Sequence, residues 1–197
     1  MSDCLAETSV PVLPAVAGRW SPSRFHPERA PTREELLALL EAARWAPSSG
    51  NEQPWRFLVV PRGHPRREAV EAALTPGNAW AKRAPVLLVT AAAEARAKNG
   101  APNGWAEHDL GIATGFLLVQ AAALGVATHP MGGWSPDALR AAVALPDGFH
   151  PMAVIAVGHH DPELRDEALE TREARPRERR PLGEVAFLGG FGEEPAG

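Results

Sequence analysis

Cysteine is nearly missing from this sequence, and so are several features that mark exported or nucleic-acid-binding proteins. The one cysteine, Cys4, excludes an internal disulfide framework and a cysteine-based zinc cluster, and it favours a reducing, cytoplasmic compartment. The N-terminus carries no basic segment followed by an apolar one, so we expect no signal peptide. The net charge of −4 gives no overall positive field, which argues against nucleic acid as a partner.

Signatures of common enzyme classes are missing as well. No G-x-G-x-x-G follows an expected strand and no G-x-x-x-x-G-K is present, which disfavours a Rossmann or P-loop enzyme. A serine hydrolase has no support because the sequence contains no G-x-S-x-G. The seven histidines are scattered without H-x-x-x-H spacing, and we therefore expect no metal site.

The apolar stretch of residues 110–127 needs weighing against a membrane span. It is close to the lower length limit for crossing a bilayer, and no second span accompanies it. A helix that is apolar all round is more often buried in a core or an interface. We therefore expect no membrane association. We also expect dimerisation, because a small domain has little interior with which to cover every face of this helix.

The chain length of 197 residues and the hydrophobic fraction of 45% suit one globular domain with a sizeable core. Residues 1–18 are rich in proline and small residues, and we expect them to form an arm that is loose or drapes over a partner. The domain then comprises residues 19–197.

The pattern of apolar residues predicts the main helices and strands. Thr32 and Glu35 form a capping box before the apolar stripe of the first helix. Helices are expected at residues 33–45, 65–74, 105–124 and 135–144, and strands at residues 55–60, 86–90 and 152–157. Residues 75–78 are expected as a turn, residues 128–134 as a loop, and residues 182–191 as a terminal strand or arm.

Two polar segments indicate a ligand with an anionic end and a planar end. Residues 19–24, Arg-Trp-Ser-Pro-Ser-Arg, offer guanidinium and hydroxyl groups, which suit a phosphate. Residues 46–55, A-P-S-S-G-N-E-Q-P-W, place small hydroxyl and amide side chains between a helix and a strand. Taken alone, the first segment is more typical of a solvated lead-in to a helix, but together the two describe a flavin mononucleotide (FMN).

Two further segments fit this interpretation, and each also has a simpler one. Arg177 and Arg179 lie on one face if the tail is extended, and can then bind the same phosphate as Arg19. A run of charges is otherwise a solvated surface. Gly132 and Gly133 allow backbone N–H groups to approach a flat ring, although the pair is also typical of a turn.

In this order, these segments resemble the FMN-dependent nitroreductase family. The resemblance runs from Arg19 to the C-terminus, and its most specific part is the A-P-S-S-x-N-x-Q-P-W run at residues 46–55. The further landmarks are Asp109, Leu110 and Gly111 at the start of the apolar helix, Met131, Gly132 and Gly133, and the arginine–proline tail at residues 177–181.

The resemblance implies an α+β fold with a mainly antiparallel sheet flanked by helices, in an intertwined homodimer with two FMN sites at the subunit interface. It implies a two-step (ping-pong) reaction in which NADH or NADPH reduces FMN at its N5 atom, after which a nitroaromatic, a quinone or a similar small acceptor is reduced. No catalytic side chain is implied.

The resemblance also assigns cofactor-binding residues. Those at the phosphate and ribityl chain are Arg19, Trp20, Ser21, Arg177 and Arg179. Those reaching the cofactor from the other subunit are Pro47, Ser48, Ser49 and Asn51. Those at the ring are Met131, Gly132 and Gly133 near N5, and Asn78 at the pyrimidine edge. Ser23 and Arg24 complete the set.

The sequence departs from the family's pattern at Ser23, where the family commonly has a basic residue near flavin N1 and O2. A cation there stabilises the anionic reduced flavin, so we expect reduction to be harder unless Arg24 or Lys82 supplies the charge. The sequence leaves both candidates open.

The sequence leaves three alternatives to this oxidoreductase open. The first is a flavin-dependent dehydrogenase of a specific metabolite or peptide. The second is a flavin store without turnover, and the third is a helical interaction module, which would be colourless. For the oxidoreductase, we expect Trp105 and residues 98–104 to cover the open face of the flavin.

Overall fold

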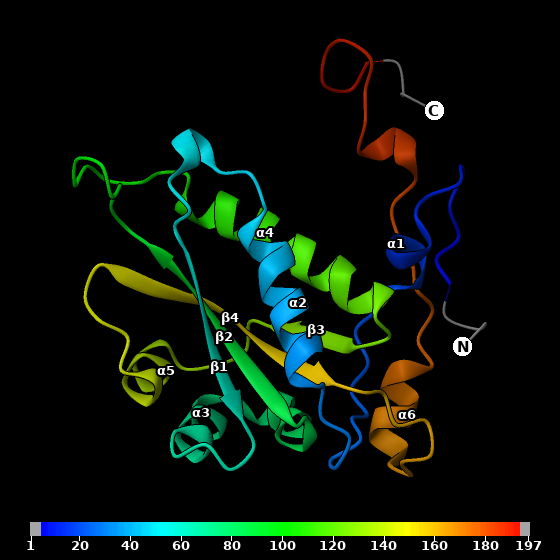
Figure 1. Ribbon diagram of the computed structural model, residues 1–197. Helices are drawn as coiled ribbons and strands as arrows, with labels where there is room; N and C mark the ends of the chain where they lie inside the picture. Colours follow the sequence, from blue (N-terminus) through cyan, green and yellow to red (C-terminus); the bar gives the residue numbers. More distant parts are fainter. Residues whose placement is uncertain (1–4, 194–197) are drawn as a thin grey trace.

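In the computed structural model, which describes residues 5–193, four strands form one antiparallel sheet in the order β1-β2-β4-β3 (Figure 1). The strands are β1 (Trp55–Pro61), β2 (Val86–Ala93), β3 (Ala127–Met131) and β4 (Phe149–Gly158). This confirms the expected α+β fold with an antiparallel sheet.

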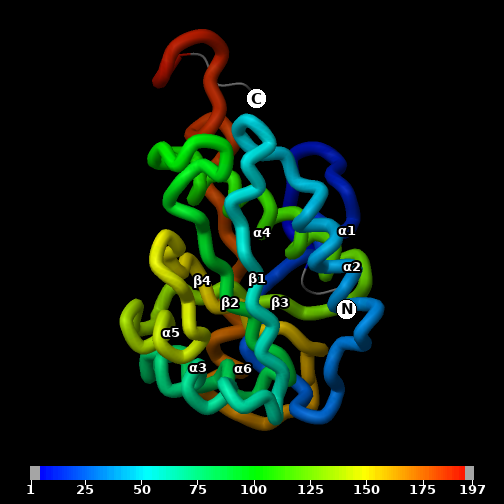
Figure 2. Tube along the Cα trace, turned by 60° about the vertical axis from the view of Figure 1, so that its left-hand side comes forward, coloured from blue at the N-terminus to red at the C-terminus, as the bar shows by residue number. Residues whose placement is uncertain are grey.

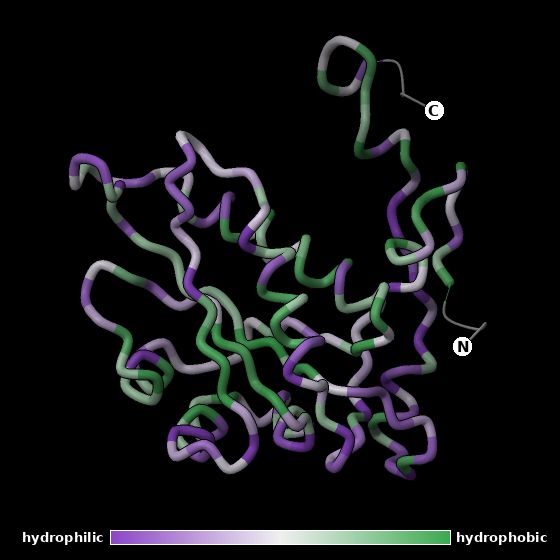
Figure 3. Tube along the Cα trace, in the orientation of Figure 1, coloured by the Kyte–Doolittle hydropathy of each residue, from purple (hydrophilic) through white to green (hydrophobic). Residues whose placement is uncertain are grey.

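The two central strands are apolar on both faces because helices cover both sides of the sheet. Leu87 and Val89 pack on one side and Leu88 packs on the other, as the twofold alternation of a strand requires. Figure 3 shows the hydrophobic colour concentrated along these strands and along much of the helix that follows β2.

Helices α2 and α4 cover one face of the sheet, and α3, α5 and a 3₁₀ helix cover the other (Figure 1). The helices are α1 (Pro14–Gly18), α2 (Arg33–Arg44), α3 (Arg67–Ala73), α4 (Ala106–Ala123), α5 (Pro136–Val143) and α6 (Glu167–Glu173). The 3₁₀ helices are η1 (Ser49–Asn51), η2 (Pro76–Arg83) and η3 (Leu182–Glu184).

Helix α2 starts as its sequence predicts. The Thr32 hydroxyl accepts a hydrogen bond from the Glu35 backbone N–H at 3.1 Å, and the Glu35 carboxylate accepts one from the Thr32 N–H at 2.7 Å. Both partners of the capping box are therefore present.

The apolar helix α4 is only partly covered by its own chain. Leu110 and Leu117 are buried against α2 and the sheet, whereas Phe116 is 46% exposed. Among residues 5–193, no helix combines the length and hydropathy that a bilayer span requires.

Helix α1 and the segment after α6 lie side by side next to α4. Helix α1 packs on α4, and the segment after α6 passes α1 before its end projects from the body of the fold (Figures 1 and 2). Part of the expected N-terminal arm, residues 1–4, lies outside the described residues.

Two sequence predictions are wrong in the connecting segments. Within residues 128–134, expected as a loop, residues 128–131 belong to the edge strand β3, where Pro130 is tolerated because an edge strand has no partner on one side. Within residues 75–78, expected as a turn, residues 76–78 begin η2. Residues 182–191, expected as a terminal strand or arm, contain the short η3 and no strand, and they lie in the projecting end of the described chain (Figure 1). The charged segment before them contains α6, which the sequence did not predict.

Candidate functional site

Arginines from both ends of the chain lie together beside α1. Arg177 donates hydrogen bonds to the backbone oxygens of Ala17 at 3.1 Å and Arg19 at 2.8 Å. The pKa of Arg19 is lowered by partial burial and by the nearby charges of Arg177 and Arg179. The three arginines form a cationic cluster whose mutual repulsion a bound anion would relieve. The structure thus brings together three residues predicted for the phosphate end.

Trp20 and Ser21 continue from this cluster. The Ser21 hydroxyl accepts a hydrogen bond from Arg19 at 3.2 Å, so hydroxyl and guanidinium groups face the same region. The Trp20 ring meets the His160 ring edge-on, with the centroids 5.0 Å apart, which attaches this segment to the chain after β4.

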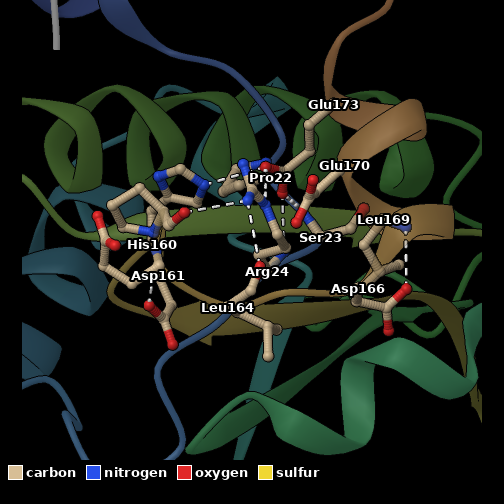
Figure 4. Close-up of polar contacts among 12 residues, drawn as sticks. Pro22, Ser23, Arg24, His160, Asp161, Leu164, Asp166, Leu169, Glu170 and Glu173 are labelled. Carbon is tan, nitrogen blue, oxygen red and sulfur yellow. Dashed lines mark hydrogen bonds and ion pairs between the residues drawn. The ribbon is translucent and has the colours of Figure 1, made fainter.

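Ser23 and Arg24 are hydrogen-bonded to a carboxylate of α6 (Figure 4). The Glu173 carboxylate accepts hydrogen bonds from the backbone N–H groups of Ser23 at 2.6 Å and Arg24 at 2.7 Å, and from the Arg24 Nε at 2.7 Å. Arg24 also donates to the backbone oxygens of Pro162 and Leu164. The Arg24 guanidinium is thus held by the protein itself, and this geometry does not support it as a cation for the cofactor.

A different cation lies near the expected ring site. The Arg172 guanidinium stands 5.5 Å from the ring centroid of Trp80, which lies in η2 two residues after Asn78. Burial lowers the pKa of His129, and the charges of Arg172 and Arg19 lower it further. Lys82, the other candidate from the sequence, is exposed. Sequence analysis did not find Arg172, because the contact depends on how α6 packs on η2.

Asn78, predicted at the pyrimidine edge of the flavin ring, and Gly133, predicted near N5, are hydrogen-bonded to each other. The Asn78 side-chain Nδ2 donates to the Gly133 backbone oxygen at 2.9 Å, and the Thr75 hydroxyl donates to the same oxygen at 3.1 Å. A β-carbon on Gly133 would lie 2.6 Å from the Asn78 Nδ2, so a side chain does not fit there. A β-carbon on Gly132 would have no atom within 4 Å, which leaves open space beside this backbone. Met131 is buried at the end of β3.

The backbone of residues 48–53 forms a tight turn. Gly50, Asn51 and Gln53 all have positive φ, at 60°, 57° and 50°, and the last two are residues for which this conformation is uncommon. The Ser48 hydroxyl accepts a hydrogen bond from the Gln53 N–H at 3.0 Å, which closes the turn.

This segment is attached to the start of α4. The buried carboxylate of Asp109 accepts a hydrogen bond from the Ser49 N–H at 2.9 Å and lies 3.0 Å from the Nδ1 of His108. A pocket of about 270 Å³ opens here. It is lined by Pro47, Ser48, Ser49, Trp105, His108, Asp109 and Ile112.

The arginine cluster and the Ser48–Asn51 turn lie at opposite ends of α4 (Figure 1). An 18-residue helix is about 27 Å long. One chain therefore does not bring these two predicted parts of the site to the same mononucleotide.

Comparison with known proteins defines the class to which this fold belongs. The sequence profile described as the nitroreductase family matches residues 16–76 and 64–159. The chain belongs to the nitroreductase family.

Individual relatives agree with this assignment. A crystal structure described as an oxidoreductase containing FMN superposes with a TM-score of 0.86 at 36% identity, covering 95% of this chain and 96% of the other. An NADH dehydrogenase of Thermus thermophilus is 32% identical over 188 residues, covering 78% of this chain and 90% of the relative. An FMN reductase [NAD(P)H] of Bacillus subtilis is 28% identical over 173 residues, covering 76% of this chain and 69% of the relative.

Proposed function

We propose that this protein is an FMN-dependent NAD(P)H oxidoreductase that works as a homodimer, with residues 19–197 as the cofactor-binding domain. Membership of the nitroreductase family supports the reaction class. The relatives described as an FMN-containing oxidoreductase and as an FMN reductase [NAD(P)H] support the cofactor and the reductant.

The observation that carries the proposal is the cluster of Arg19, Arg177 and Arg179. Three guanidinium groups that repel one another, with one hydroxyl beside them, match the charge and hydrogen-bonding capacity of a phosphate monoester. Arg177 also ties the tail to residues 17 and 19, so binding of the phosphate would stabilise the contact between the two ends of the chain.

The ring end of FMN fits the segment around Asn78 and Gly133. The space beside Gly132 admits a flat ring close to the backbone, and the Asn78–Gly133 hydrogen bond fixes the position of that backbone. When bound, FMN supplies hydride transfer at its N5 atom. The protein's part is to hold the ring and to leave one face accessible to the reductant and then to the acceptor.

A second copy of the chain completes the site in this proposal. The Pro47–Asn51 side chains lie about one α4 length from the arginine cluster of their own chain, so they serve the partner's cofactor. The exposed apolar side of α4, with Phe116, offers a surface that a partner would bury.

The reaction is a two-step exchange in which NADH or NADPH leaves before the acceptor enters. The proposed acceptors are nitroaromatics, quinones or similar small molecules, and the pocket of about 270 Å³ beside Ser48 and Ser49 suits a ligand of small size. We place this reaction in the cytoplasm, in line with the single cysteine.

The absorbance spectrum of the purified protein, followed by anaerobic titration with NADH and with NADPH, tests the proposal. We expect a yellow protein that bleaches with one equivalent of reductant per flavin and regains its colour when a quinone is added. A colourless protein would contradict the cofactor assignment. A yellow protein that neither nicotinamide bleaches would instead indicate a flavin store.

A further inference from the structure

A histidine lines the pocket beside the Ser48–Ser49 turn. His108 lines the pocket together with the apolar groups of Pro47, Trp105 and Ile112. The His108 side chain is 57% exposed, so one of its ring nitrogens can meet a molecule bound there. The Trp105 ring stands edge-on to the imidazole, with the centroids 5.3 Å apart, and limits how the ring can turn.

Asp109 fixes which nitrogen of His108 faces outward. The Asp109 side chain is 2% exposed, and its Oδ1 lies 3.0 Å from the His108 Nδ1. Its other oxygen accepts the Ser49 N–H at 2.9 Å, so the carboxylate cannot follow the imidazole if the ring turns. An imidazole oriented by a buried carboxylate at Nδ1 presents Nε2 for proton transfer, as in other acid–base pairs of this kind.

We propose that His108 donates a proton through Nε2 to the acceptor bound in this pocket, and that Asp109 is the positioning residue for its ring. This inference rests on the proposed function. It assigns an acid to a reaction for which the sequence implied no catalytic side chain. Among the residues lining the pocket, Asp109 is the other titratable group, and it faces Nδ1 rather than the pocket.

The second half-reaction consumes a proton, which such a donor would supply. A quinone that becomes a hydroquinone gains one hydride from the reduced cofactor and one proton. The hydride accounts for both electrons, and the His108 imidazolium supplies the proton at the oxygen that becomes a hydroxyl. The neutral imidazole then regains its proton from water.

Two acceptors that differ in their need for a proton separate this role from a structural one. Benzoquinone takes up a hydride and a proton, whereas ferricyanide takes up single electrons and no proton. For His108→Gln, we expect kcat/KM for benzoquinone to fall by about 100-fold. Ferricyanide reduction and FMN content should stay within about twofold of the parent protein, because an exposed side chain contributes little to folding.

His150→Gln is the matched control. His150 is paired with Glu94 and Glu107 near the same end of α4 but does not line the pocket. We expect this variant to reduce both acceptors normally. Asp109→Asn should lower the benzoquinone rate by about tenfold, since the ring loses its orientation but keeps its proton.

Equal losses with both acceptors, or an unchanged benzoquinone rate in His108→Gln, would overturn the inference while leaving the proposed function intact. A parent protein that binds no FMN would overturn the proposed function and this inference with it.

Discussion

The Nε of Arg24 lies 2.7 Å from the Oε2 of Glu173, and this ion pair joins two segments that are 149 residues apart in the sequence. The Nε2 of His160 lies 3.0 Å from the same oxygen, so the carboxylate joins α6 to two other parts of the chain (Figure 4). Because Arg177 and Arg179 follow α6 directly, the pair also sets where the C-terminal arginines start relative to Arg19.

Removing this carboxylate should destabilise the protein and loosen the cofactor site. The side chains of Arg24 and Glu173 are 14% and 5% exposed, and breaking a buried pair from one side leaves a charge without compensation. We expect Glu173→Ala to lower the free energy of unfolding by about 3 kcal/mol. Denaturant unfolding measures this. Glu170→Ala, on the same helix with a loose 3.9 Å pair to Arg165, should cost less than about 1 kcal/mol.

Because the pKa of Glu173 is lowered in the folded protein, we expect the protein to lose stability in acid. Burial by itself raises the pKa of this carboxyl group, but hydrogen bonds from His160, Arg24 and the Ser23 N–H lower it to about 2, from 4.5 in the unfolded chain. A lowered folded-state pKa contributes stability above pH 4.5 that disappears as the pH falls from 4.5 towards 2.

Unfolding free energies of the parent protein and Glu173→Gln, measured at pH 7, 4 and 3, test this dependence. The difference between the two proteins should shrink as the pH falls. A difference that is constant over this range would show that the charge of Glu173 does not carry its effect.

Two neighbouring glycines should respond differently to the same substitution. In Gly133→Ala the new β-carbon would lie 2.6 Å from Asn78 and 2.7 Å from the Thr75 hydroxyl, so the backbone or these side chains must move. We expect a loss of about 1–3 kcal/mol in the free energy of unfolding. Gly132→Ala, whose β-carbon meets no atom within 4 Å, should unfold like the parent protein. Equal effects at both positions would contradict this account of the turn.

The proposed dimer depends on the apolar outer side of α4. Phe116 is 46% exposed, so Phe116→Asp should leave the fold of one chain intact while opposing association. We expect a monomer by sedimentation analysis, with an unchanged far-ultraviolet circular dichroism spectrum and little retained FMN. A Phe116→Asp protein that remains dimeric would place the interface elsewhere.

Local signals in the sequence predicted the elements that depend on local interactions. The Thr32–Glu35 capping box involves residues three positions apart, and the apolar runs of β2 and β4 specify strands buried on both faces. Strand β3 was missed because its Pro130 indicates a loop, and pairing with β4 is what makes this segment a strand.

The site shows the same division. Residue chemistry was enough to group Arg19 with Arg177 and Arg179, since a phosphate calls for guanidinium groups. The sequence did not predict the pairing of Arg24 with Glu173, because it did not predict helix α6. This helix is rich in charged residues and has little apolar pattern, and its one buried residue is Leu169. The pocket with His108 likewise requires the approach of the Ser48–Ser49 turn to α4.

The central claim is that Arg19, Arg177 and Arg179 bind the phosphate of FMN, and the affinities for FMN and riboflavin test it most directly, because riboflavin has the same ring without the phosphate. We expect the parent protein to bind FMN at least about 100-fold more tightly than riboflavin. Arg19→Gln should remove most of that preference while leaving riboflavin affinity unchanged, and Arg44→Gln, at an exposed ion pair with Glu41, should change neither. An Arg19→Gln protein that keeps the full preference for FMN would contradict the account.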